Sequence, residues 1–168
     1  MMKHFARLLF PGFLIILFTS GCASITKGPT QRVQINSEPS GARILQNGQT
    51  VGITPETLTL SRKRGHSFTI EKAGFKPETV TFLTVPNKPA DAFIRFGIDD
   101  TFGAHNDLTP ESASVELQPA ILPDEPGDNP FAELAAKIVE VDEQLARRQI
   151  SAEDHRYILS RLFEFYQP

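Results

Sequence analysis

The stretch from Gln31 to Leu83 most strongly limits the folds open to this chain of 168 residues. Within it, apolar and polar residues alternate in short runs, which is the period of a half-buried strand. Turn residues separate these runs every few positions, at Pro39-Ser40-Gly41, Asn47-Gly48, Gly52 to Pro55, Arg62 to Gly65 and Lys72 to Phe75. We therefore predict a mainly β fold, in which five or six short strands form a small antiparallel β-sandwich or barrel-like unit.

Composition excludes several classes of protein. A single cysteine, Cys22, rules out an internal disulfide, so packing alone must hold the fold. The mild net charge of -3 argues against nucleic acid as a partner. The length allows one modest domain with additional segments, and thirteen prolines indicate irregular connections between them.

The first residues have the pattern of an export signal. A short basic start precedes a nearly continuous apolar run from Leu8 to Phe18, about half of the roughly 20 residues that a membrane-spanning helix needs. Such a run is typical of a signal peptide, which we place at residues 1–21. An uncleaved signal anchor and ordinary signal cleavage are the alternatives.

The end of this signal, Phe18-Thr19-Ser20-Gly21-Cys22, resembles the lipobox of bacterial lipoproteins. The resemblance implies that the Cys22 thiol carries diacylglycerol, that the chain is cut before this cysteine, and that its new amino group receives a further acyl chain such as palmitate. Two or more acyl chains give stable anchoring. Residues 22–30 would then be a tether, and Ala23 in place of aspartate implies the outer membrane, facing the periplasm.

Four turns in the central stretch resemble those of the PEGA domain, a small β module of surface and envelope proteins. They are Pro39-Ser40-Gly41-Ala42, Asn47-Gly48, Gly52-Ile53-Thr54-Pro55 and Lys72-Ala73-Gly74-Phe75. Ser40 replaces the glutamate for which the family is named. We place the domain at residues 31–85. Motifs of this kind specify a fold far better than a function.

The candidate ligand-binding residues of this domain are Arg62, Lys63 and Arg64, which form a basic loop suited to anionic lipid or glycan. The alternative is an ordinary solvated charge run. We expect His66, beside the loop, to be a surface strand residue. Phe68 is expected in the core and Phe75 over a turn, with stacking on a sugar as the other possibility for both.

Residues 86–118 are predicted to be an acidic extension that ends in a closing strand at 114–117. Hard cations prefer clustered carboxylates, and this segment contains Asp99, Asp100, His105 and Asp107. The spacing lacks the glycine and the terminal glutamate of a calcium loop, so we predict no metal site. We expect the acidic residues to face the basic β unit instead.

A Pro-rich linker at 119–129 leads to a predicted helical hairpin at 130–166. Asn129 and Pro130 suit the start of the first helix, and Ser151 the start of the second. The expected inward stripes are Phe131, Leu134, Ala135, Ile138, Val141 and Leu145 in the first helix, and Ile158, Leu159, Leu162 and Phe165 or Tyr166 in the second. So short a hairpin is barely stable alone. Its stripes must pack on the β unit, a second copy or a partner.

The segment between the helices, Gln149-Ile150-Ser151-Ala152-Glu153, resembles that of the short C-terminal domain called SHOCT, with Arg148 and Gln149 where a glycine is usual. The resemblance implies an interaction or oligomerisation element. A stabilising cap without a partner is the alternative.

The chain contains no nucleophile elbow, no phosphate-binding glycine loop and no paired metal ligands in its sequence. We therefore predict no enzyme and no cofactor. The leading hypothesis is a lipid-anchored cell-envelope lipoprotein that acts as a binding or scaffolding module, with residues 130–166 contacting an envelope protein or a second copy. The alternative hypothesis is binding of peptidoglycan or surface polysaccharide by the β domain.

Overall fold

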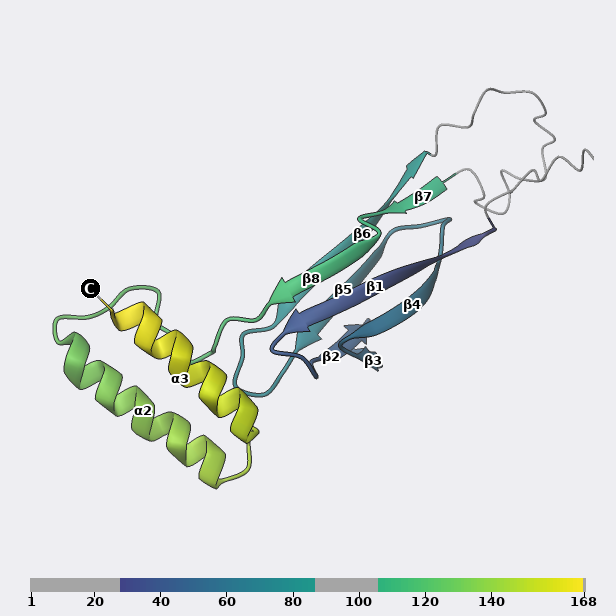
Figure 1. Cartoon of the computed structure of the whole chain (residues 1–168). Helices are drawn as coiled ribbons and strands as arrows, with labels where there is room; N and C mark the ends of the chain where they lie inside the picture. The colour runs from purple at the N-terminus through teal and green to yellow at the C-terminus, as the bar shows by residue number, and fades with distance from the viewer. Residues whose placement is uncertain (1–27, 87–105, 168) are drawn as a thin grey trace, which may run out of the picture.

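The computed structural model describes residues 28–86 and 106–167. These residues form a β unit of eight strands, followed by a helical hairpin of two helices, so the predicted mainly β class is confirmed (Figure 1). The strands are β1 Thr30–Glu38, β2 Arg43–Gln46, β3 Gln49–Ile53, β4 Glu56–Ser61, β5 His66–Glu71, β6 Glu78–Pro86, β7 Asn106–Thr109 and β8 Ser112–Glu116. The helices are α2 Pro130–Ala146 and α3 Ala152–Tyr166.

The eight strands form a sandwich of two sheets. One sheet has the strand order β4-β1-β8 and the other has the order β3-β2-β5-β6-β7. In the part of the chain that the structure describes, the sheets do not close into a barrel. Neighbouring strands are antiparallel, as predicted, except that β8 runs parallel to β1, with Gln34 opposite Ser112.

The predicted closing strand is present as β8, and β7 pairs with β6 as an additional strand that the sequence pattern did not predict.

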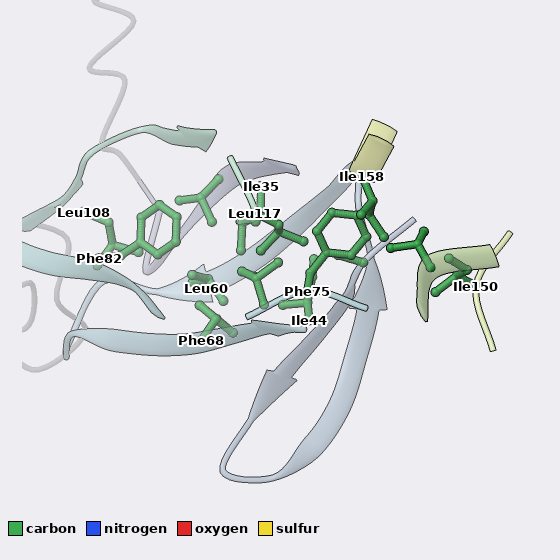
Figure 2. Close-up of a cluster of buried hydrophobic side chains, with 14 of the residues drawn as sticks. Ile35, Ile44, Leu60, Phe68, Phe75, Phe82, Leu108, Leu117, Ile150 and Ile158 are labelled. Carbon is green, nitrogen blue, oxygen red and sulfur yellow. The ribbon is translucent and has the colours of Figure 1, made fainter. Parts of the chain in front are cut away.

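The core of the sandwich follows from the alternation in the sequence. Val33 and Ile35 are fully buried on β1, and Phe68 and Phe82 are buried opposite them. The two phenyl rings pack edge to face with centroids 6.0 Å apart. Burying each such side chain stabilises the fold by about 1.5–3 kcal/mol. Figure 2 shows Ile35, Phe68 and Phe82 in one continuous cluster that runs on through Phe75 toward the helices.

The turn motifs have visible structural roles. Asn47 and Gly48 adopt φ angles of 51° and 78°, as a type I′ hairpin requires. The buried Thr54 joins its own turn to the turn at Pro39 to Ala42, because its N–H donates to the Ala42 carbonyl (2.8 Å) and its hydroxyl oxygen accepts from the Ala42 N–H (3.0 Å). The Thr54 carbonyl accepts from the Gly41 N–H (2.8 Å). The first and third motif turns, Pro39 to Ala42 and Gly52 to Pro55, are therefore parts of one hydrogen-bonded arrangement.

The helices begin where their capping residues predict. The Asn129 side chain accepts from the Ala132 N–H (3.2 Å), and Ser151 Oγ accepts from the Asp154 N–H (3.1 Å). At the end of α2, Arg148 adopts a φ of 58°. Its N–H donates to the Leu145 carbonyl, and the next N–H donates back to Gln144, which together form a Schellman motif.

The hairpin lies against one end of the β unit and buries part of its predicted stripes there, with Val141, Ile158 and Leu162 enclosed. The stripe prediction was wrong for Phe131 and Ala135. Phe131 is 86% exposed and Ala135 also faces solvent. The apolar positions of α2 span a wide arc, and only the part that faces α3 and the β unit is covered.

Candidate functional site

The basic loop does not form one cationic surface. Arg62 is buried, whereas Lys63 and Arg64 are exposed. The Arg62 guanidinium donates to the carbonyls of Thr30 (3.0 Å) and Asn106 (3.0 Å), and it pairs with the Asp107 carboxylate. Arg62 therefore holds the start of β1 against β7, and at most its two neighbours present charge to a ligand.

His66 is buried, so its prediction as a surface strand residue was wrong. It shares the inward face of β5 with Phe68, and the two rings stack with centroids 6.3 Å apart. Its Nε2 lies 2.9 Å from the Ser61 carbonyl and its Nδ1 lies 3.3 Å from the Gln46 amide. A neutral imidazole that donates from Nε2 and accepts at Nδ1 satisfies both contacts.

A polar groove lies beside Arg62, on the sheet that contains β1. Its volume is about 540 Å³, and it is lined by Gln31, Arg32, Gln34, Thr57, Arg62, Asp107, Glu111 and Ser112. The Gln31 amide fixes one wall, because it donates to the Leu108 carbonyl and accepts from the Leu108 N–H, both at 2.9 Å. Amides, hydroxyls and carboxylates of this kind can hydrogen-bond a hydroxyl-rich ligand. No aromatic ring is among the lining residues, so stacking on a sugar is not available there.

The junction between the β unit and the hairpin is built on the turn from Lys72 to Phe75. Phe75 is buried and contacts the Tyr157 ring of α3, with centroids 5.8 Å apart. Gly74 has a φ of +84°, and a Cβ there would lie 2.9 Å from Ile150 Cγ2. The turn therefore requires glycine both for its backbone angle and for the close approach of the hairpin. Phe75 is not available for stacking on a sugar.

Charged groups complete the junction. Lys72 Nζ lies 2.8 Å from Asp154 Oδ1, and their side chains are only 16% and 7% exposed. Lys72 also reaches the Ser40 carbonyl of another motif turn. Burial and the neighbouring Glu116 carboxylate raise the pKa of the Tyr157 phenol above its usual 10.0. The junction thus combines aromatic packing with a nearly buried ion pair.

The hairpin also has an apolar surface that faces away from the junction. Phe131 and Val139 are 86% and 58% exposed on α2, and Phe163 is exposed on α3. Near the start of α2 a small cavity of about 250 Å³ is lined by Pro126, Pro130, Phe131, Phe165, Tyr166 and Gln167. Burial and the Glu133 carboxylate, which accepts a hydrogen bond from the Tyr166 hydroxyl (3.3 Å), raise the pKa of that tyrosine. We regard this surface as the candidate protein-binding site.

Other predicted features lie outside the described residues. Cys22 and the signal segment are among them, as are Asp99, Asp100 and His105. Asp107 is described, and it faces Arg62 as the acidic extension was expected to face the basic unit. Within residues 28–86 and 106–167, no three His, Cys, Asp or Glu side chains gather as metal ligands would. Neither α2 nor α3, the helices in these ranges, is long and apolar enough to cross a membrane.

The comparison with protein families agrees with the turn motifs. Residues 30–89 match the family model of the PEGA domain. The β unit therefore contains a PEGA domain. No curated protein and no solved structure matches the chain. Both β7 and β8 lie beyond the PEGA match, yet they pair with strands inside it, so the folded β unit is larger than the matched region.

Proposed function

We propose that this protein is a lipid-anchored, non-enzymatic lipoprotein of the bacterial cell envelope, in which the PEGA unit is a rigid support and the helical hairpin binds another protein. PEGA domains are often associated with surfaces and envelopes. The lipobox-like segment before Cys22 supports attachment through that cysteine. An outer-membrane location facing the periplasm is part of the same proposal.

The direction of β1 supports separate roles for the β unit and the hairpin. The strand enters the sandwich at the end far from the helices and finishes beside them, where Leu117 N–H donates to the Glu38 carbonyl (Figure 1). Nine residues of extended strand span roughly 30 Å. A lipid on Cys22 would therefore attach to one end of the β unit, and the hairpin would be held at the opposite end.

The observation that carries the proposed binding role is the exposed apolar surface of the hairpin around Phe131 and Val139. The inner stripe already packs on the β unit, so an apolar outer face is not needed for docking within the chain. Exposed apolar surface of this kind is typical of protein interaction sites.

The lipid anchor is tested by replacing Cys22 with alanine in the full chain and separating membranes from soluble protein. We expect the wild-type protein in the membrane fraction and the variant outside it. A variant that still sediments with washed membranes would contradict lipid attachment at Cys22.

A second candidate function, binding of peptidoglycan or surface polysaccharide, is favoured by the polar groove beside Arg62. Purified cell-wall sacculi test it in a pelleting assay with the full-length protein in detergent. Salt-resistant pelleting that is lost when Gln34 is changed to alanine would support glycan binding. Protein that stays in the supernatant would leave the hairpin as the binding region.

A further inference from the structure

The outer face of α2 carries a regular apolar row. Phe131, Ala135 and Val139 are four residues apart, so their side chains follow one another along one side of the helix. All three are exposed, and Ala132 and Ala136 extend the apolar surface beside them. We call Phe131, Ala135 and Val139 the outer row.

A cavity lies at the start of the outer row. Phe131 forms part of its wall together with Pro126, Pro130 and two rings of α3, Phe165 and Tyr166. Its volume of about 250 Å³ lies below the roughly 300–1,000 Å³ of small-molecule sites. A cavity of this size suits a single apolar side chain from a docking segment, and such filled cavities are frequent energetic centres of interfaces.

Acidic residues lie at both ends of the outer row. Asp128 is three residues before Phe131, and Asp142 and Glu143 are three and four residues after Val139. From Asp124 to Arg147 the chain has seven acidic residues and two basic ones. Asp142 pairs with His155 and Glu143 with Arg147, but both carboxylate side chains remain more than half exposed. The surface around the outer row is therefore acidic.

From this arrangement we infer that the outer row binds an amphipathic helix of a partner protein, with apolar residues on one side and Lys or Arg near both ends. A helix lays its apolar face into a groove through residues spaced at i, i+4 and i+7. Basic residues at its ends would meet Asp128 on one side and Asp142 and Glu143 on the other. This inference rests on the proposed role of the hairpin in protein binding and specifies the chemistry of the partner.

The same charges disfavour a second copy of this chain as the occupant. A two-fold symmetric contact uses the same surface on both subunits. An antiparallel pairing of outer rows would place Asp128 against the other copy's acidic end, and a parallel pairing would place it against its counterpart. Like charges in such positions oppose association. The same carboxylates attract a helix that has basic residues at its ends.

The inference is tested with the full-length protein in phosphatidylcholine nanodiscs and two fluorescent synthetic helical peptides. Both peptides carry the same leucine row, one with lysines at both ends and the other with glutamates in the same places. Fluorescence anisotropy gives the affinities, and empty nanodiscs give the background. We expect the lysine peptide to bind at least about tenfold more tightly, with an affinity that falls as salt rises.

Surface variants locate the site. Val139→Ser should weaken binding of the lysine peptide by about tenfold or more. Val51→Ser is the matched control, because Val51 is an exposed valine of β3 and its replacement should leave binding unchanged. The double variant Asp128→Asn, Glu143→Gln should reduce the difference between the affinities for the lysine and the glutamate peptide. Unchanged circular dichroism would show that each variant is folded.

Three results would overturn the inference. Equal affinity for both peptides would remove the charge argument while leaving the hairpin as a protein-binding element. Binding that Val139→Ser does not weaken would place the site elsewhere. Binding of neither peptide, with a dimer that Val139→Ser dissociates, would make a second copy the occupant. Failure of the proposed function itself would appear separately, as the absence of any protein cross-link to the hairpin in cells.

Discussion

The β unit and the helical hairpin differ in how completely they enclose their apolar residues. In the β unit, two sheets cover both sides of a core in which Phe68 and Phe82 are fully buried. In the hairpin only the inner face is covered, and Phe131 stays 86% exposed. The first region has a core enclosed on both sides, whereas the second packs on a neighbour with one face and leaves apolar side chains exposed on the other.

Among the variants that test this difference, Phe68→Ala should have the largest effect on the free energy of unfolding. Removing a fully buried phenyl ring costs about 3–5 kcal/mol, and the ring also packs edge to face on Phe82. We expect the free energy of unfolding in urea to fall by that amount. Because the junction rests on the β unit, both regions should unfold together. Loss of the hairpin alone would contradict the dependence described here.

Breaking the ion pair at the junction should affect the hairpin and leave the β unit unchanged. Asp154→Asn leaves the nearly buried Lys72 without its carboxylate, and breaking a buried pair costs about 3–5 kcal/mol. We expect amide exchange to speed up in α2 and α3 while β5 and β6 stay protected. Glu164→Gln is the control, because the Glu164 side chain is 68% exposed in its pair with Arg161 and pairs at the surface contribute about 0–1 kcal/mol. Faster exchange throughout the β unit would contradict a junction-only role for Asp154.

A smaller effect, of opposite sign, is expected at the end of α2. Arg148 has a φ of 58°, which glycine adopts without strain. Arg148→Gly should therefore stabilise the hairpin by up to about 1 kcal/mol, measured as a rise in the thermal midpoint. Arg147→Gly is the matched control. Arg147 has a φ of -79°, so the substitution should destabilise instead. A decrease with Arg148→Gly would show that the arginine side chain has a role that outweighs the strain.

The smallest effect should appear at alkaline pH. The pKa of Tyr157 is raised above 10.0 in the folded protein, so folding favours the protonated phenol. The resulting stability is fully present below pH 10 and is lost as the pH rises through the folded pKa. We expect Tyr157→Phe to reduce the loss of hairpin stability above pH 10, measured by thermal unfolding. An identical pH dependence in both proteins would contradict the partial burial of Tyr157 at the junction.

The sequence predicted the elements better than it predicted the faces they present. Strand positions followed from alternation and from turns such as Asn47-Gly48, because both depend on neighbouring residues. Arg62 was misjudged as part of an exposed loop because its partners Thr30 and Asn106 are 32 and 44 residues away. Phe131 was placed inward because helical spacing defines an arc of apolar residues, and only the packed structure decides which part of that arc is covered.

The central claim is that the hairpin binds a partner protein and that the PEGA unit supports the hairpin. The most direct measurement is photo-cross-linking in living cells, with a photoreactive amino acid at Val139 of the full chain and, separately, at Thr59 on the outer face of β4. We expect a protein adduct at Val139 and none at Thr59. Adducts at Thr59 alone, or no adduct at either position, would contradict the account and return attention to the polar groove of the β unit.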